Sequence, residues 1–263
     1  MKIIAFYSFK GGVGRSLTLL NVGYHLARKH GFKVGIIDLD IESSGIHSML
    51  NLKIPDENSI THFLIPQNRK ISDIEKYVHK INKFGRLSEV YLMPSISSAS
   101  DLVKIQWDKA EDVFLRDRII PTFEKIYNLD FLLVDSRAGV SRLSVSPLSQ
   151  ADLCVVCFRL DKQNQYGIPH IVNICNTAGV PYHSVVSSIP LIKNYKKAID
   201  LFVKSINSQI DSKYRFEVDD ILPYMSELYF EELLISKVKP ETSLSKAYIK
   251  LTNSILQKLA VNE

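Results

Sequence analysis

The sequence predicts an α/β fold in which a mostly parallel sheet of about seven or eight strands carries helices on both faces. First, an apolar strand at residues 3–7 runs into a glycine-rich segment and then into a helical pattern. Second, another apolar strand at 33–38 follows that helix, and this order predicts a right-handed parallel crossover. Third, more short apolar strands follow, at 90–94, 130–135, 153–158, 184–190 and 216–224. The 263 residues suit one large α/β domain, so we expect a single domain over 1–263.

The first strand leads into a loop that has the residues of a phosphate-binding loop. Its sequence is Phe9-Lys10-Gly11-Gly12-Val13-Gly14-Arg15-Ser16. Backbone N–H groups around such glycines, together with the N-terminus of the next helix, can cradle phosphate oxygens. A long cation at position 15 can reach the β- and γ-phosphates, and Ser16 can offer its hydroxyl to Mg²⁺. The common pattern has glycine in place of Phe9 and lysine in place of Arg15. Because arginine keeps its charge but is bulkier, we expect binding to survive and hydrolysis to be slow.

Acidic residues end two of the other predicted strands. Asp38 and Asp40 follow the strand at 33–38, at the edge where parallel sheets place their ligands. Carboxylates near Mg²⁺ and a triphosphate can hold metal-bound water or orient the attacking water. Asp135 ends the apolar strand at 131–135, which is the Walker B pattern that holds Mg²⁺.

These segments resemble the ParA/MinD-type ATPases. The run Lys10 to Gly14 resembles their deviant Walker A motif, in its Lys-Gly-Gly-Val-Gly-Arg variant, and 38–45 and 131–139 resemble their switch I and switch II. The resemblance covers nearly the whole chain and is specific at 9–17, 38–45 and 131–139. It implies a P-loop fold of the SIMIBI type, with ATP and Mg²⁺ as ligands.

The resemblance also implies roles for single residues. Lys10 would be the signature lysine that reaches the nucleotide of a second subunit, and Asp40 would position the attacking water; these two are the catalytic candidates. Gly139 would present its N–H to the γ-phosphate, and Pro223 would contact adenine through its backbone. Ser16, Asp38 and Asp135 would hold the metal. The nucleotide-binding candidates are Lys10, Gly11, Gly12, Val13, Gly14, Arg15, Ser16, Leu17, Gly139 and Pro223.

The resulting hypothesis is a Mg-dependent ATPase that dimerises around ATP and controls a partner protein or DNA. An alternative from another class is a catalytically weak nucleotide-binding scaffold, which Arg15 keeps open. A third is a partition-type protein that binds DNA without sequence preference. Ser187 and Ser188 stand where relatives have an Asn or Asp that reads adenine, so the choice of base stays open. Arg137 could stabilise transferred charge or pair with a nearby carboxylate.

Charge and composition narrow the class of protein less than the motifs do. The formal net charge of +5 suits nucleic acid or phosphate ligands, but lysines at 70–83 and 193–197 also suit solvated helix faces. No signal peptide or long apolar span is apparent, so we expect a cytoplasmic protein, and a helix at 243–260 that covers the sheet rather than binding membrane. Cys154 and Cys157 are three apart in a strand and would face opposite sides, which indicates core packing. The stretch 101–128 is predicted to be helical, and its Trp107 is expected to anchor the core. A buried helix face is also predicted where apolar residues recur at helical spacing, at Ile71, Ile74, Tyr77, Val78 and Ile81.

Overall fold

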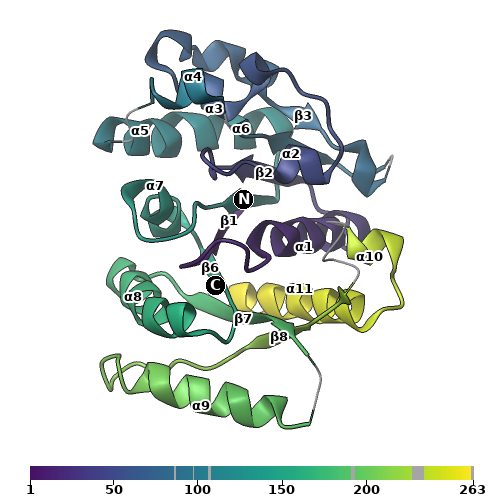
Figure 1. The fold of residues 1–263 in the computed structure, drawn as a ribbon. Helices are drawn as coiled ribbons and strands as arrows, with labels where there is room; N and C mark the ends of the chain where they lie inside the picture. Colours follow the sequence, from purple (N-terminus) through teal and green to yellow (C-terminus); the bar gives the residue numbers. More distant parts are fainter. Residues whose placement is uncertain (86, 97, 106–107, 191–192, 227–233, 262–263) are drawn as a thin grey trace.

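The computed structural model describes residues 1–85, 87–96, 98–105, 108–190, 193–226 and 234–261. The described residues form one eight-stranded sheet in the order β3-β4-β2-β5-β1-β6-β7-β8 (Figure 1). Neighbouring strands are parallel except β3 and β4, which are antiparallel. The strands are β1 (Lys2–Tyr7), β2 (Val34–Asp38), β3 (His79–Lys80), β4 (Val90–Met93), β5 (Phe131–Asp135), β6 (Leu153–Phe158), β7 (Tyr182–Ile189) and β8 (Asp220–Pro223). The predicted mostly parallel sheet is confirmed.

Long helices connect the central strands, and shorter helical turns fill the region between β2 and β5. The α-helices are α1 (Arg15–Lys29), α2 (Ile46–Met49), α3 (Ile60–Phe63), α4 (Ala99–Leu102), α5 (Lys109–Phe114), α6 (Ile120–Tyr127), α7 (Arg142–Val145), α8 (Lys162–Ala178), α9 (Tyr195–Asn207), α10 (Ile235–Val238) and α11 (Ser243–Val261). The 3₁₀ turns are Asp56–Asn58, Pro66–Asn68, Ile71–Tyr77, Asn82–Phe84 and Leu148–Gln150, and Leu115–Ile119 is a π-helical turn.

The core lies on both faces of the sheet because side chains alternate along each strand. Ile4 and Phe6 of β1 pack with α1 and α11 on one face, whereas Ala5 and Tyr7 pack with α8 and α9 on the other. A third cluster joins β2 and β5 to α3 and α6. Figure 1 shows α1 and α11 on one side of the sheet and α8 on the other. The predicted doubly wound arrangement is confirmed.

The two strand cysteines follow this alternation. Cys157 belongs to the cluster under α1 and α11, and Cys154 to the cluster under α8 and α9. Both are buried free thiols, as is Cys175. The prediction that they pack in the core is confirmed.

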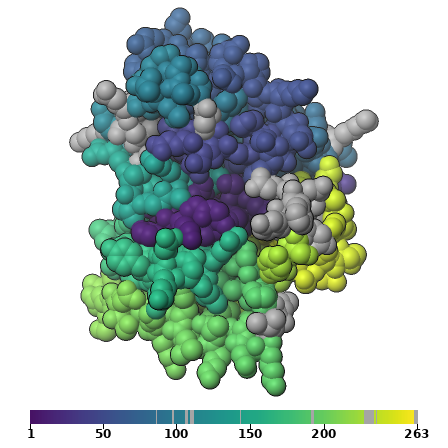
Figure 2. All heavy atoms as spheres, in the orientation of Figure 1, coloured from purple at the N-terminus to yellow at the C-terminus, as the bar shows by residue number. Residues whose placement is uncertain are grey.

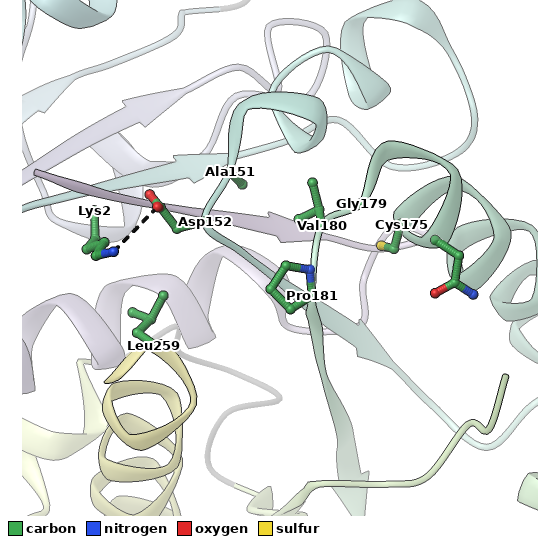
Figure 3. Close-up of a pocket in the computed structure, with 9 residues that line it drawn as sticks. Lys2, Ala151, Asp152, Cys175, Gly179, Val180, Pro181 and Leu259 are labelled. Carbon is green, nitrogen blue, oxygen red and sulfur yellow. Dashed lines mark ion pairs between the residues drawn. The ribbon is translucent and has the colours of Figure 1, made fainter. Parts of the chain in front are cut away.

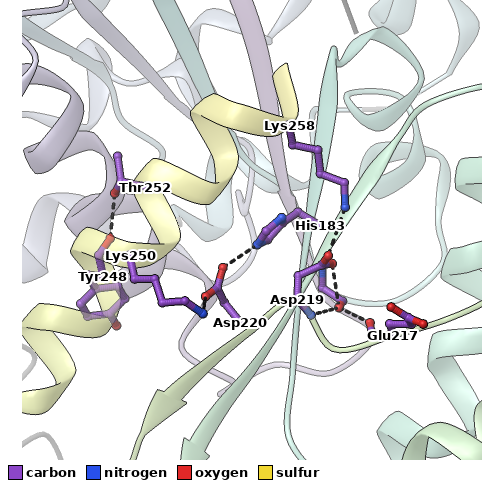
Figure 4. Close-up of polar contacts among 9 residues, drawn as sticks. His183, Glu217, Asp219, Asp220, Tyr248, Lys250, Thr252 and Lys258 are labelled. Atoms are coloured by element: carbon purple, nitrogen blue, oxygen red, sulfur yellow. Dashed lines mark hydrogen bonds and ion pairs between the residues drawn. The ribbon is translucent and has the colours of Figure 1, made fainter. Parts of the chain in front are cut away.

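A polar cluster fastens α11 to the edge of the sheet (Figure 4). Asp220 of β8 accepts a hydrogen bond from Lys250 at 2.6 Å and lies 2.9 Å from His183 of β7. Burial by itself would raise the pKa of Asp220, but hydrogen bonds from His183 and Lys250 outweigh it and lower the pKa. Lys258 pairs with Asp219 at 3.3 Å. The prediction that this helix covers the sheet is therefore confirmed. These ion pairs hold its polar face to the sheet, in addition to the packing of its apolar stripe.

Three local predictions differ from the structure. The stretch 101–128 is not one α-helix, because α4 ends at Leu102, α5 begins at Lys109, and a π-helical turn separates α5 from α6, whose first turn contains Pro121. The helical stripe predicted through Val78 and Ile81 ends at Tyr77, where the short strand β3 follows. The last strand is shorter than 216–224. Trp107 lies outside the described residues.

The strand order brings the predicted motifs to one edge. Because β5 lies between β1 and β2, their carboxyl ends are neighbours, and Asp135 is in register with both Phe6 and Asp38. The space-filling view in Figure 2 shows residues of the N-terminal part, coloured purple, at the surface in the middle of this face. The loop after β1 thus meets the acidic ends of β2 and β5.

Candidate functional site

The loop between β1 and α1 has a backbone that glycine makes possible. Gly12 and Gly14 have φ values of 72° and 80°, a left-handed conformation that other residues rarely adopt. Apart from the glycine itself and its chain neighbours, no atom of the described residues lies within 4 Å of where a Cβ would stand on either residue. Gly14 is the N-cap of α1, and neither a capping side chain nor an acidic residue occupies the first turn. The partial positive charge of the α1 N-terminus is therefore not offset by a capping side chain among the described residues, which suits an anion.

Contacts with two other elements, β7 and α8, fix this loop in place. Ser187 of β7 donates a hydrogen bond to the Val13 carbonyl at 2.7 Å. Phe9 packs against α8 beside Tyr166 and His170, with ring centroids 6.1 and 6.4 Å apart. A Cβ on Gly167 of α8 would overlap the Phe9 ring, so this glycine permits the contact. The sequence pattern did not reveal either contact, since both join residues more than 150 positions apart.

Arg15 occupies the centre of the site. Its Nε lies 2.5 Å from Asp135 Oδ1, its Nη2 lies 2.6 Å from Asp40 Oδ2, and its Nη1 donates to Ser8 Oγ at 3.3 Å. The Arg15 side chain is 6% exposed. Burial opposes its charge, but the two carboxylates outweigh that effect and raise the pKa of the guanidinium. Arg15 thus joins the phosphate-loop helix to the ends of β2 and β5.

The acidic residues around Arg15 differ in their partners. Burial raises the pKa of Asp135, while the Arg15 guanidinium and the Ser16 hydroxyl oppose that rise. Asp38 is fully buried, and its Oδ1 accepts a hydrogen bond from the Asp40 N–H at 3.0 Å. Burial, and next the charge of Asp135, raise the pKa of Asp38 to about 8. Burial therefore raises the pKa of both carboxyls, because it disfavours their charged forms.

Ser16, Asp38 and Asp135 have the chemistry of a magnesium site. The Ser16 hydroxyl donates a hydrogen bond to Asp135, and Asp38 Oδ2 is a buried oxygen with no hydrogen-bond partner in the described part of the chain. Within the described part of the chain, no group of three or more His, Cys, Asp or Glu side chains could hold a metal ion by itself. Mg²⁺ does not require such a group, since it is usually held by one or two carboxylates, water and substrate phosphates. The residues present fit this ion.

Four of the nucleotide-binding candidates line a cavity of about 240 Å³ beside the loop. Val13, Gly14, Leu17 and Pro223 all border it. Arg159, Ser187 and Ser188 also border it and add polar groups. The sequence did not single out Arg159, although it lies in the polar loop after β6 at the carboxyl edge. The cavity has the mixed apolar and polar lining of a small-molecule site.

Gly139 and Lys10 lie at the same edge but contact other protein groups. The Gly139 N–H donates to the Ser8 carbonyl at 3.0 Å, and the Tyr7 hydroxyl donates to the Gly139 carbonyl at 2.8 Å. The Lys10 ammonium is 4.0 Å from Asp161 Oδ2, and its side chain is 47% exposed. Asp161 caps α8 by accepting from the Asn164 N–H at 2.9 Å. Lys10 thus belongs to the loop, and its side chain lies at the surface beside Asp161, the N-cap of α8.

Arg137, for which the sequence left two roles open, pairs with a carboxylate. Its Nη2 lies 2.6 Å from Glu42 Oε2. Arg137 follows β5 and Glu42 follows β2, so the pair links the two segments that resemble the switches.

A cavity of about 600 Å³ lies away from these residues, at the amino ends of the strands (Figure 3). It is bordered by the ion pair of Lys2 and Asp152, which are 3.8 Å apart, and by Cys175 and Leu259. No glycine-rich loop opens into it within the described residues. The phosphate-binding chemistry is at the opposite edge of the sheet.

A glycine-rich loop that leads into a helix at the carboxyl edge of a doubly wound sheet defines the class of P-loop nucleotide-binding proteins. The family model AAA_31, described as an AAA domain, matches residues 1–184. The chain belongs to this family and is a ParA/MinD-type P-loop ATPase.

Relatives with similar sequences come from several bacteria. The virulence plasmid ParA family protein pGP5-D of Chlamydia psittaci is 25% identical over 269 residues, which cover 100% of this chain and 97% of that protein. The septum site-determining protein MinD of Thermotoga maritima is 33% identical over 141 residues, 53% of this chain and 45% of that protein.

Solved structures share the fold at lower identity. MinD of Pyrococcus horikoshii OT3 complexed with Mg-ADP superposes with a TM-score of 0.75 at 17% identity, covering 100% of this chain and 98% of that one. A plasmid partition protein of Borrelia burgdorferi B31 bound to AMPPNP gives a TM-score of 0.74 at 16% identity, covering 98% and 99%. The described helices include none that is both long and apolar enough to cross a membrane.

Proposed function

We propose that the protein is a Mg-dependent ATP-binding and slowly ATP-hydrolysing switch that dimerises around its nucleotide. The observation that carries this proposal is the convergence of Arg15 and Ser16, at the start of α1, with Asp40 and Asp135. Cation, hydroxyl and carboxylates at a helix N-terminus are the groups that phosphoryl transfer needs. The Mg-ADP and AMPPNP complexes of the structural neighbours support the choice of ligand.

Each part of the nucleotide has a place in this proposal. The N–H groups of Gly11 to Ser16 bind the phosphates, and the Arg15 guanidinium neutralises them. The base enters the 240 Å³ cavity between Leu17 and Pro223. Ser16, Asp135 and Asp38 hold Mg²⁺, which would neutralise charge on the phosphate oxygens. The 263 residues then act as one ATPase domain.

Asp40 has the central part in hydrolysis. Its carboxylate orients a water molecule whose oxygen bonds to the γ-phosphorus while the bond from phosphorus to the bridging oxygen breaks. The bridging electron pair leaves with ADP, one water proton stays on the inorganic phosphate, and the other passes to solvent by way of Asp40. Arg15 Nη2 occupies Asp40 Oδ2, so the water would bind at the other carboxylate oxygen, Oδ1. Sharing one carboxylate between the guanidinium and the water restricts how the water can be oriented, which is a physical reason for slow turnover.

Dimerisation would complete the site. Lys10 would leave Asp161 and bind the nucleotide of a second copy, as the signature lysine of related ATPases implies. The ATP-bound dimer would then present a surface to a partner protein or to DNA. Lys193, Lys196 and Lys197 at the start of α9 could contribute to a DNA-binding surface.

The test combines phosphate release with size-exclusion chromatography in Mg·ATP and in Mg·ADP. We expect slow release and a dimer with ATP alone. Asp40→Ala should abolish release and keep the dimer, and Lys10→Ala should remove both. Lys213→Ala is the matched control, because Lys213 also forms an exposed ion pair, with Asp211 at 3.5 Å. A wild-type protein that binds no nucleotide would disprove the proposal.

The second candidate function is a nucleotide-binding scaffold with little turnover. The buried Arg15–Asp40 pair favours it, because it engages the carboxylate that would orient water. Tight ATP binding without phosphate release or change of size would support the scaffold. Arg15→Lys would then show whether the guanidinium silences the site. Binding of arbitrary duplex DNA that weakens steeply with salt would support the partition-type function.

A further inference from the structure

Arg137 is placed where a second positive charge could meet the γ-phosphate. It lies two residues after Asp135, and its partner Glu42 lies two residues after Asp40. Because β2 and β5 are neighbouring parallel strands with Asp38 in register with Asp135, both segments begin beside the phosphate loop. The Arg137–Glu42 pair therefore joins the two segments that follow Asp40 and Asp135, and the second of these contacts the start of the phosphate loop through the Gly139 N–H and the Ser8 carbonyl.

Arg15 and Arg137 differ in how firmly they are held. Arg15 is 6% exposed and is bonded by two carboxylates and Ser8. Arg137 is 36% exposed, and among the described residues it forms an ion pair with one carboxylate, Glu42, which is 47% exposed. Removing Arg15 from its partners would leave buried charges uncompensated, which is costly. An exposed ion pair contributes little to stability, so Arg137 can change partners readily.

We propose that Arg137 is a catalytic residue that leaves Glu42 and binds the γ-phosphate of ATP. This inference rests on the proposed ATPase function and extends it. A guanidinium presents two parallel donors that match phosphate oxygens, and a triphosphate with its high negative charge competes well with one carboxylate. During transfer of the phosphoryl group to water, Arg137 stabilises the charge on the transferred oxygens while the leaving electron pair stays on ADP.

In this proposal Glu42 competes with the γ-phosphate for Arg137. In the absence of the γ-phosphate it holds Arg137 and ties together the segments that follow β2 and β5. The pair therefore competes with ATP but not with ADP, which lacks the group that Arg137 would bind. Removing a state of the protein that competes with a ligand raises the apparent affinity for that ligand. Glu42 consequently makes the protein less sensitive to ATP while leaving ADP binding unchanged.

The experiment measures affinity by isothermal titration calorimetry with the full chain, using Mg·ATPγS and Mg·ADP separately. Arg137→Ala should weaken ATPγS binding by about tenfold or more, the loss of one charge-assisted contact, and leave ADP binding within about twofold. The affinity of Arg137→Lys for ATPγS should lie between those of the wild type and Arg137→Ala, because lysine keeps the positive charge but lacks the two parallel donors of the guanidinium. Glu42→Gln should strengthen ATPγS binding by at most about fivefold. Arg215→Ala is the matched control, because Arg215 forms an exposed pair with Glu217 at 2.7 Å.

The outcomes separate this inference from the proposed function. If the wild-type protein binds neither nucleotide, the proposed function fails and the inference fails with it. If the wild type binds both but Arg137→Ala changes neither affinity, or weakens both equally, only the inference is overturned. Thermal unfolding of each variant without nucleotide identifies a change that merely disturbs the fold. A selective loss for ATPγS, with unchanged unfolding, supports a γ-phosphate contact.

Discussion

At the scale of single residues, Arg15 contributes to stability as well as to the proposed chemistry. Its guanidinium contacts Asp135, which is 1% exposed, and Asp40. Arg15→Ala would leave both carboxylates without their cation, so we expect the free energy of unfolding to fall by about 3–5 kcal/mol. Urea denaturation without nucleotide measures this loss. Arg215→Ala serves as the exposed control and should stay within about 0.5 kcal/mol of wild type. A loss below about 1 kcal/mol for Arg15→Ala would show that the buried pairs do not stabilise the fold.

Gly167 offers a second test at this scale, in which the sign of the effect is informative. Alanine normally stabilises a helix interior relative to glycine by about 1 kcal/mol. At position 167 a Cβ would overlap the Phe9 ring, so Gly167→Ala should instead destabilise by about 1–3 kcal/mol. Adding Phe9→Ala should recover part of that loss, which a double-mutant cycle in urea would measure. Additive effects in the two variants would contradict the packing of Phe9 on α8.

At the scale of elements, the contact between α1 and α10 is sensitive to pH. His25 Nε2 lies 2.7 Å from Ser236 Oγ, while its buried Nδ1 has no hydrogen-bond partner within the described chain. Burial, with a smaller contribution from Lys29 and His30, lowers the pKa of His25 from 6.5 to about 4. The folded state therefore favours neutral His25, and an acid pH favours the unfolded state in which this histidine binds a proton.

The sign of the expected pH dependence follows directly. Between pH 6.5 and about 4 the unfolded chain binds more protons at His25 than the folded chain, so the free energy of unfolding should fall as pH falls. His25→Gln keeps a polar group near Ser236 but cannot titrate. We expect the difference between wild type and this variant in urea denaturation to change across that pH range. A difference that is constant with pH would contradict the burial of a neutral histidine.

Local patterns predicted the central elements well and the contacts between them poorly. The apolar runs and glycines predicted β1, β2, β5 and α1, and strand order alone then brought Asp38, Asp40 and Asp135 to one edge. The two-residue strand β3 was not predictable, because so short a segment is defined by its partner β4 rather than by its own periodicity. Pairings such as Arg15–Asp135 depend on side chains 120 positions apart, which no local pattern contains.

At the scale of the whole molecule, the N-cap of α8 affects the proposed dimer. Asp161 holds Lys10 within one subunit at 4.0 Å, whereas the dimer requires Lys10 to reach a second copy. Asp161→Asn removes the charge and keeps an N-cap residue, since asparagine caps helices as well as aspartate. The buried Asn164 Oδ1 has no partner among the described residues and could accept from the new amide after a flip. The variant should therefore fold normally and release Lys10.

We expect Asp161→Asn to favour the ATP-dependent dimer. An ion pair at 4.0 Å between groups that are 47% and 34% exposed contributes at most about 1 kcal/mol, so association should strengthen by no more than about fivefold for each Lys10 released. Sedimentation over a range of concentrations in Mg·ATPγS would measure the change. The double variant Lys10→Ala, Asp161→Asn should show no gain over Lys10→Ala alone. An equal gain in both backgrounds would mean that Asp161 acts on the dimer by a route other than Lys10.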